Sequence, residues 1–285
     1  MAEQLPSIDP RSIPSLTLRD SVTIPQIGLG VFKIDPEITQ EAVEAALALG
    51  YRHIDTATGY NNEAQVGAAL KASGLPRDEI FVTTKLYNPD HKAGDVRGAF
   101  ERSLTALGLD AVDLYLIHWP LPRLGLYVDT WKELEKVKLE GLAREIGVSN
   151  FEIPHLEKLI DETAIIPAVD QVELHPLFQQ RELRAFLKEK GIQIEAWAPL
   201  GQGRFDLGAY PALSDAAQAH GKSVAQVILR WHLQTGIVAI PKAINPVHMR
   251  ENLDIADFEL TADEMAAIDA LDTGHRLAAD PNTHE

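Results

Sequence analysis

Short apolar runs alternate with amphipathic helical patterns along most of this chain, and this alternation limits its fold more than any other feature. Apolar residues recur at three- and four-residue steps in the helical segments, as Val43, Ala46 and Leu47 do in one of them. Gly50 and Gly191 follow two of these segments, which is typical of helix C-termini. We predict strands at residues 27–31, 53–55, 80–85, 112–118, 145–148, 168–173, 193–198 and 237–241, and helices at residues 39–49, 63–72, 96–107, 130–139, 153–161, 181–190 and 224–234.

The order of these elements predicts the fold class. Strands that alternate with helices pair in parallel through right-handed crossovers, and eight such units in 285 residues predict an α/β fold, a TIM-type (β/α)8 barrel. Residues 15–27 contain two short alternating runs that predict an N-terminal β-hairpin, and residues 246–253 and 262–271 predict extra C-terminal helices. The expected organisation is a flexible N-terminal lead at residues 1–14 and a single barrel domain at residues 15–285.

A doubly wound open sheet would also alternate strands with helices. If such a sheet bound a dinucleotide, a glycine-rich turn would be expected between its first strand and its first helix. Gly28 and Gly30 form a G-x-G pattern here, but the third glycine of that turn is missing. The sequence therefore favours the barrel.

Composition and charge exclude several classes of partner. The formal net charge of −16 argues against nucleic acid and anionic membranes as partners, because their many phosphate groups require a basic face on the protein. A single small phosphorylated ligand stays compatible, since it needs only a local set of donors. The chain has no cysteine, which excludes disulfides and thiolate metal sites. It also lacks a signal-peptide pattern and a long apolar run, so we expect a cytoplasmic monomer that contacts no membrane.

Four chemically active residues lie at or just after the ends of successive predicted strands: Asp55, Tyr60, Lys85 and His118. In a barrel these strand ends open onto one face, where active sites lie. A nearby ammonium lowers the pKa of a phenol, so Lys85 would make Tyr60 a better acid, while Asp55 orients Lys85. Singly, each residue has an ordinary structural explanation. Together they suit protonation of a carbonyl oxygen while a nicotinamide delivers hydride to its carbon.

Polar and flat side chains at the later strand ends are candidates for binding that cofactor. Ser149, Asn150 and Gln171 could pair with an amide, although Ser149 and Asn150 could equally cap a helix. Trp197 offers a ring for stacking, or for ordinary barrel packing. The run Gly201-Gln202-Gly203 lets the backbone approach a phosphate closely, although the same run would suit a plain loop.

Five stretches of the sequence closely resemble the aldo-keto reductases, and in particular their bacterial 2,5-diketo-D-gluconic acid reductase-like members. The resemblance runs from about residue 16 to about residue 275, with the stretches in the family's order. The stretches are GYRHIDTATGYNNE at 50–63, FVTTKL at 81–86, DLYLIHWP at 113–120, REIGVSNF at 144–151 and IPKAINPVHMRENLD at 240–254.

This resemblance implies a barrel that binds NADPH without a Rossmann fold and uses no metal. Tyr60 would be the general acid, Lys85 and Asp55 would tune it, and His118 would orient the substrate carbonyl. The substrate pocket would consist of Phe32, Tyr87, His118 and Trp119 beside Tyr60. The implied cofactor contacts are Ser149, Asn150 and Gln171 for the carboxamide, Trp197 for the nicotinamide ring, Pro199, Leu200, Gly201 and Gly203 for the pyrophosphate, and Lys242, Ala243, Ile244, His248, Glu251 and Asn252 for the 2′-phosphate and adenine.

The chain departs from the family pattern at four of these positions. Ala243 replaces the usual serine, and His248 stands where an arginine usually clamps the 2′-phosphate. We therefore expect a weakened preference for NADPH, with NADH also used. Trp197 stands where tyrosine is common and preserves stacking, while Tyr87 replaces a common tryptophan and makes the pocket wall slightly more polar.

The segment after His118 and the C-terminal tail are both short, which predicts an open pocket for small aldehydes, α-dicarbonyls and keto-sugars. A cofactor-binding regulatory or sensor module with little turnover is the alternative function, and the complete set of four residues favours turnover over it. A metal-dependent hydrolase would need clustered ligands at strand ends, which the run His53-Ile54-Asp55 supplies poorly.

Overall fold

The computed structural model describes residues 5–92 and 95–284, and within them the main strands form a parallel barrel. Each of these strands pairs in parallel with the next one along the chain. The two ends of the sheet also meet, because Ile27 pairs with Ala239 and the Gly28 N–H donates to the Ala239 carbonyl at 2.9 Å. The predicted (β/α)8 barrel is confirmed, with strands β3 Leu29–Gly30, β4 His53–Asp55, β5 Phe81–Leu86, β6 Val112–Ile117, β7 Ala143–Ser149, β8 Val169–Glu173, β9 Gln193–Trp197 and β10 Val238–Ala239.

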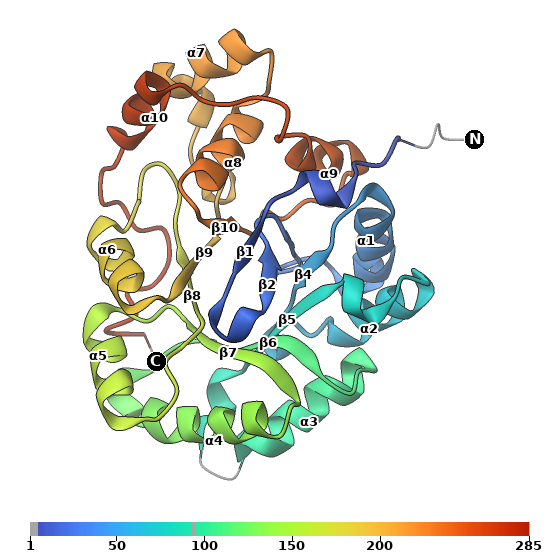
Figure 1. The fold of residues 1–285 in the computed structure, drawn as a ribbon, viewed down its shortest axis with the longest axis vertical. Coiled ribbons are helices and arrows are strands. Elements are labelled where there is room, and N and C mark those ends of the chain that lie inside the picture. Colours follow the sequence, from blue (N-terminus) through green and yellow to red (C-terminus); the bar gives the residue numbers. More distant parts are fainter. Residues whose placement is uncertain (1–4, 93–94, 285) are drawn as a thin grey trace.

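Helices surround the barrel (Figure 1). The helix Val224–Gln234 begins with a capping box in which Ser223 and Gln226 satisfy each other's backbone N–H groups. One helix was not predicted, because its sequence PALSDAAQAH buries only Leu213 and two alanines and has little apolar periodicity. The helices are α1 Pro36–Leu49, α2 Glu63–Ala72, α3 Asp95–Leu107, α4 Tyr127–Leu139, α5 Ile153–Glu162, α6 Arg181–Lys190, α7 Pro211–His220, which is the unpredicted one, α8 Val224–Gln234, α9 Pro246–Leu253 and α10 Ala262–Asp269.

The predicted hairpin is present as β1 Ser15–Thr17 and β2 Thr23–Pro25, which pair antiparallel. Figure 1 shows it crossing the middle of the ring of strands. Leu18, Val22 and Ile24 of this hairpin join a buried apolar cluster inside the barrel that includes Leu114 and Val238. Because the hairpin closes the N-terminal end of the barrel, the C-terminal ends of the strands are left as the open face.

The N-terminal segment packs against the barrel wherever the structure describes it. The Ile8 N–H donates to the Leu49 carbonyl at 2.8 Å, and Arg250 Nε donates to the Pro6 carbonyl at 3.1 Å. Ile13 is buried in the main core. These contacts hold residues 5–14 against α1 and α9, where a flexible lead was expected. Residues 1–4 of that lead, and residues 93–94 and 285 of the barrel domain, lie outside the described residues.

Candidate active site at the barrel mouth

The structure brings Asp55, Tyr60 and Lys85 into direct contact. Asp55 is the last residue of β4, Lys85 lies in β5, and Tyr60 ends the 3-10 turn Thr58–Tyr60 that follows β4. The Lys85 ammonium donates to Asp55 Oδ1 at 2.6 Å, to the Thr56 carbonyl at 3.0 Å and to the Tyr60 hydroxyl at 3.4 Å. The lysine is fully buried, so all three of its hydrogen bonds are fixed by the protein.

His118, the fourth predicted residue, faces Tyr60 across the mouth. It follows β6 directly, and its ring lies edge-on to the Tyr60 ring with 5.6 Å between centroids. Burial, with smaller contributions from the charge of Lys85 and from two neighbouring histidines, lowers the pKa of His118 to about 3. The imidazole is therefore neutral at physiological pH and can hold an oxygen by a hydrogen bond.

Burial and charge act in opposite directions on the Tyr60–Lys85 pair. Burial raises the pKa of Tyr60 above its usual range, although the Lys85 ammonium pulls it down. Burial by itself would lower the pKa of Lys85, but the neighbouring Asp55 and Tyr60 raise it above its ordinary value. The predicted effect of Lys85 on Tyr60 thus has the expected direction, yet desolvation outweighs it. Both groups keep their protons at neutral pH.

A chain of hydroxyl contacts positions the turn that carries Tyr60. Thr58 Oγ1 donates to the Lys85 carbonyl at 3.0 Å and lies 2.9 Å from Ser103 Oγ. On the other side of the turn, Asn62 Nδ2 donates to the Val31 carbonyl at 3.0 Å. Sequence reasoning missed these residues, and the only signal was the polar character of the turn between β4 and α2.

The residues predicted to bind the carboxamide form one hydrogen-bonded group. Ser149 Oγ donates to the Gln171 carbonyl at 2.7 Å, and Asn150 Nδ2 donates to the His118 carbonyl at 3.0 Å. The indole N–H of Trp197 donates to Asn150 Oδ1 at 2.9 Å. The side chain of Gln171 turns inward, where Nε2 donates to Asp55 Oδ2 at 2.8 Å. Gln171 thereby links this group to the Asp55–Lys85 pair.

The residues predicted to bind the rest of the cofactor lie in the segments after β9 and β10. Gly201 and Gly203 have φ values of 65° and 68°, and a Cβ at Gly203 would meet nothing within 4 Å. This open space lets a ligand approach the backbone closely. Pro199 and Ala243 are buried, Leu200 and Glu251 are half-buried, and Lys242, Ile244 and His248 are exposed.

Asn252 is the predicted adenine contact that the structure turns away from the surface. Asn252 is buried in α9, and its side chain hydrogen-bonds Tyr51. Burial raises the pKa of Tyr51, and this hydrogen bond partly opposes the rise. Glu251, beside it, keeps a half-buried carboxylate. An adenine ring would therefore meet Glu251 before Asn252.

The predicted substrate residues line the mouth, and the C-terminal segment reaches them. Phe32 and Tyr87 are each 43% exposed, and the Phe32 ring lies 4.9 Å from the Tyr60 ring. The Trp119 ring packs against the His284 ring in a tilted arrangement, with 4.2 Å between centroids and 47° between the ring planes. The short tail thus crosses the mouth and forms part of its wall.

One carboxylate on β8 fixes the path of this tail. The N–H groups of Leu277 and Ala278 donate to the two oxygens of Glu173 at 2.6 and 2.9 Å. Arg276 pairs with Glu152 at the start of α5. Sequence reasoning missed these contacts, because nothing in the tail itself indicates which strand it approaches.

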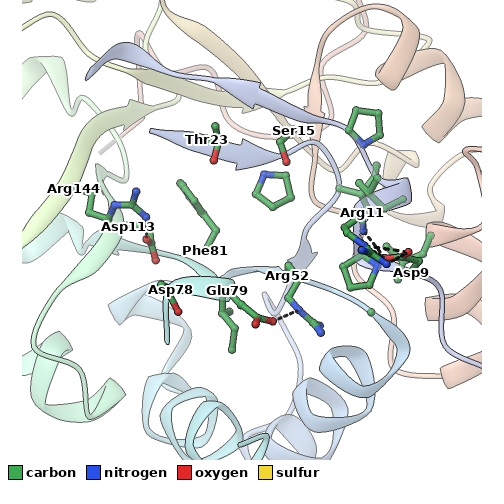
Figure 2. Close-up of a pocket in the computed structure, with 18 residues that line it drawn as sticks. Asp9, Arg11, Ser15, Thr23, Arg52, Asp78, Glu79, Phe81, Asp113 and Arg144 are labelled. Carbon is green, nitrogen blue, oxygen red and sulfur yellow. Dashed lines mark hydrogen bonds and ion pairs between the residues drawn. The ribbon is translucent and has the colours of Figure 1, made fainter. Parts of the chain in front are cut away.

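The opposite end of the barrel holds a cavity of about 800 Å³ between the N-terminal segment and the strand starts. Figure 2 shows its arginines beside carboxylates: Arg52 pairs with Glu79 at 3.8 Å and Arg144 with Asp113 at 2.9 Å. None of the four predicted catalytic residues lines it. Since this end of a barrel normally serves stability, we place the active site at the mouth.

Among residues 5–92 and 95–284 no group of three or more His, Cys, Asp or Glu side chains is arranged to hold a metal ion. In the same residues no helix has the length and apolar character needed to cross a membrane.

Comparisons with known proteins agree with the geometry of the mouth. A sequence profile for the "Aldo/keto reductase family" matches residues 26–273. An aldo-keto reductase of Mycobacterium sp. strain KMS is 50% identical over 270 residues, which cover 95% of this chain and 97% of that protein. A methylglyoxal reductase DkgA of Yersinia pestis is 49% identical over 268 residues, with 94% and 96% covered. The crystal structure of a Gox0644 variant in complex with NADPH has a TM-score of 0.91 and 45% identity, and covers 96% of this chain and 99% of its own.

Proposed function

The chain belongs to the aldo/keto reductase family of NAD(P)H-dependent oxidoreductases, and from that premise we propose that it reduces small carbonyl compounds with NADPH. The observation that carries this proposal is the buried Lys85 ammonium, which bonds Asp55 at 2.6 Å and Tyr60 at 3.4 Å at the open end of the barrel. A buried ammonium held against a phenol at a barrel mouth suits proton donation to a carbonyl oxygen. The solved Gox0644 complex supports the choice of NADPH.

The residues along one side of the mouth fit this cofactor. Ser149 and Asn150 present hydroxyl and amide groups beside the half-buried ring of Trp197. Gly203 leaves space beside the backbone, and Lys242 is an exposed cation after β10. A flat ring, an amide partner, an open backbone turn and a cation match the successive parts of a nicotinamide dinucleotide phosphate.

We assign the proton chemistry to Tyr60. When bound, the reduced nicotinamide supplies a hydride to the carbonyl carbon. The carbonyl oxygen then needs a proton, which the Tyr60 hydroxyl holds at neutral pH because burial raises its pKa. Lys85 stabilises the phenolate that remains, and Asp55 and the Thr56 carbonyl keep the ammonium in place. Neutral His118 orients the carbonyl oxygen by a hydrogen bond without competing as the acid.

The surroundings of the proposed 2′-phosphate site support weak discrimination against NADH. Lys242 supplies one exposed cation, while Ala243 is buried and has no hydroxyl group. Arg250 does not replace the missing arginine, because it bonds the Pro6 carbonyl at 3.1 Å and Asp254 at 3.5 Å. His248 is exposed on α9, and histidine makes no bidentate pair with phosphate.

The proposed substrates are small aldehydes, α-dicarbonyls and keto-sugars. The half-exposed Phe32 and Tyr87 leave the mouth accessible, while His284 against Trp119 limits its width. The methylglyoxal reductase named among the relatives acts on an α-dicarbonyl by its name, which supports this class. The proposal also includes a cytoplasmic location and a monomeric state.

A steady-state assay tests the proposed function. NADPH oxidation is measured with methylglyoxal, a small aldehyde and a keto-sugar, and NADPH binding is measured separately. We expect turnover that saturates with at least one of these substrates. Tight NADPH binding without turnover on any of them would instead favour the sensor alternative.

A further inference from the structure

A second acid lies inside the barrel below the Asp55–Lys85 pair. Glu195 in β9 is fully buried, and neither of its carboxyl oxygens has a hydrogen-bond partner of normal geometry among the described residues. Its Oε1 lies 3.7 Å from Nε2 of His53, which is also fully buried. Gln171 is its partner in register on β8. Such an acid carries a large desolvation cost if it ionises.

The groups facing Glu195 come from three other strands. His53 and Asp55 lie on β4, Lys85 on β5 and Gln171 on β8. Lys85 is the cation among them, and its donors are used by Asp55, the Thr56 carbonyl and Tyr60. His53 does not supply a second cation, because burial lowers its pKa to about 3. Glu195 therefore has no cation of its own.

This arrangement makes Glu195 neutral at physiological pH. Burial raises the pKa of Glu195 to about 8, and the charge of Asp55 adds to that rise, while the Lys85 ammonium and the Gln171 amide oppose it. In alkaline solution the carboxyl group ionises, and its charge then acts on the ammonium and the phenol above it. A negative charge there raises the pKa of both Lys85 and Tyr60.

We propose that Glu195 is a positioning residue of the reductase, which gains a negative charge in alkaline solution and thereby keeps the proton on Tyr60 through the Lys85–Asp55 pair. This inference rests on the proposed role of Tyr60 as the general acid. Glu195 is fully buried, so it does not touch the substrate. Its effect reaches the reacting atoms through the field at Lys85.

The test compares wild type with Glu195→Gln, which keeps the shape of the side chain and removes its ionisation. The readout is the pH profile of kcat/KM for carbonyl reduction. Without the charge at position 195 the pKa of Tyr60 falls, so the alkaline limb moves to lower pH by about half a unit to one unit. Glu195→Asp keeps a carboxyl group and should retain most of the wild-type limb.

Glu145→Gln is the matched control. Glu145 is another buried acid, but it lies on β7 and pairs with Lys138 and not with the active-site lysine. Its substitution should leave the position of the alkaline limb unchanged. A purely structural role of Glu195 would lower kcat/KM in Glu195→Gln while its alkaline limb stays at the position found for wild type and Glu145→Gln, and this result would overturn the proposal.

Unfolding measured against pH gives a readout that needs no activity. The pKa of Glu195 is raised from 4.5 to about 8 in the folded state. The contribution of Glu195 to the unfolding free energy is therefore complete below the unfolded-state pKa and is lost as pH rises through the folded-state pKa. The Tm of wild type relative to Glu195→Gln should therefore fall between pH about 5 and about 9. A difference in Tm that stays constant with pH overturns the proposal.

The proposed function and this inference fail in distinguishable ways. If Tyr60→Phe keeps reductase activity, the assignment of Tyr60 as the general acid is wrong. The Tm of wild type relative to Glu195→Gln still reports the ionisation of Glu195 in that case. If Glu195→Gln does not fold, Glu195→Asp supplies both readouts. For Glu195→Asp, an alkaline limb of kcat/KM at the wild-type position supports the proposal only if its Tm also falls with rising pH as the wild-type Tm does. Loss of this fall in Tm counts against the proposal.

Discussion

The indole N–H of Trp197 donates to Oδ1 of Asn150 at 2.9 Å. An indole N–H can only donate, so this bond fixes which end of the Asn150 amide is the oxygen. The amide nitrogen then donates to the His118 carbonyl at 3.0 Å. The ring proposed to stack on the cofactor and the backbone that carries the carbonyl-orienting histidine are thus joined through one side chain.

Replacing Trp197 should loosen cofactor binding even when an aromatic ring is kept. Trp197→Phe preserves a flat ring but leaves Asn150 Oδ1 without its donor. We expect the Kd for NADPH to rise roughly fivefold, which corresponds to a net hydrogen bond of about 1 kcal/mol. Calorimetric titration of wild type and Trp197→Phe measures this. An unchanged Kd would mean that the bond to Asn150 contributes nothing to the site.

Removing the Lys85 ammonium should affect both activity and stability. Lys85→Met leaves Asp55 buried without its cation, which should cost about 3–5 kcal/mol of unfolding free energy and lower kcat at least about 100-fold. Adding Asp55→Asn should restore part of the stability, because no unpaired charge then remains, but none of the activity. Urea unfolding and kcat of the single and double variants check this. Equal stability of the two variants would show that Asp55 takes up a proton once the ammonium is removed.

An arginine at position 248 should strengthen discrimination between the two cofactors. His248→Arg supplies the bidentate donor that the 2′-phosphate site lacks. The ratio of kcat/KM for NADPH to kcat/KM for NADH should therefore rise about tenfold, which corresponds to a free energy difference of about 1.4 kcal/mol. Lys242→Met should lower the same ratio by reducing activity with NADPH alone. A wild-type preference for NADPH of a thousandfold or more would contradict the weak discrimination expected here.

Buried histidines should make the fold sensitive to mild acid. Burial lowers the pKa of His91 to about 4 and that of His232 to about 4. Their folded-state pKa values lie below the unfolded-state pKa of 6.5. The two histidines therefore make their full contribution to the unfolding free energy above pH 6.5 and lose it as pH falls toward 4. The unfolding free energy should therefore drop between pH about 7 and about 5. His91→Leu should show a smaller drop, and an identical one would exclude His91 as a source.

The sequence was sufficient to predict the strand order and the convergence of Asp55, Lys85 and His118, because each ends an apolar run and the ends of parallel strands meet at one face. It could not predict that Gln171 contacts Asp55, since 116 residues separate them along the chain. Nor could it show that Glu195 lies near His53, because that proximity depends on closure of the barrel.

The path of the C-terminal tail and the presence of helix α7 could not be predicted from the sequence, for different reasons. The path of the tail is fixed by Glu173, which lies 104 residues before Leu277, and tertiary contacts of this kind leave no local pattern. Helix α7 is rich in alanine, so it has helix propensity without the apolar stripe that identifies a packed helix.

Single-turnover reduction of methylglyoxal by Tyr60→Phe, compared with wild type at neutral pH, is the sharpest test of Tyr60 as the general acid. The phenylalanine keeps the ring against Phe32 and His118 but has no proton to donate. We expect an unchanged Kd for NADPH and a reduction rate that falls at least about 100-fold. A variant that binds NADPH normally and reduces the substrate at the wild-type rate would contradict it.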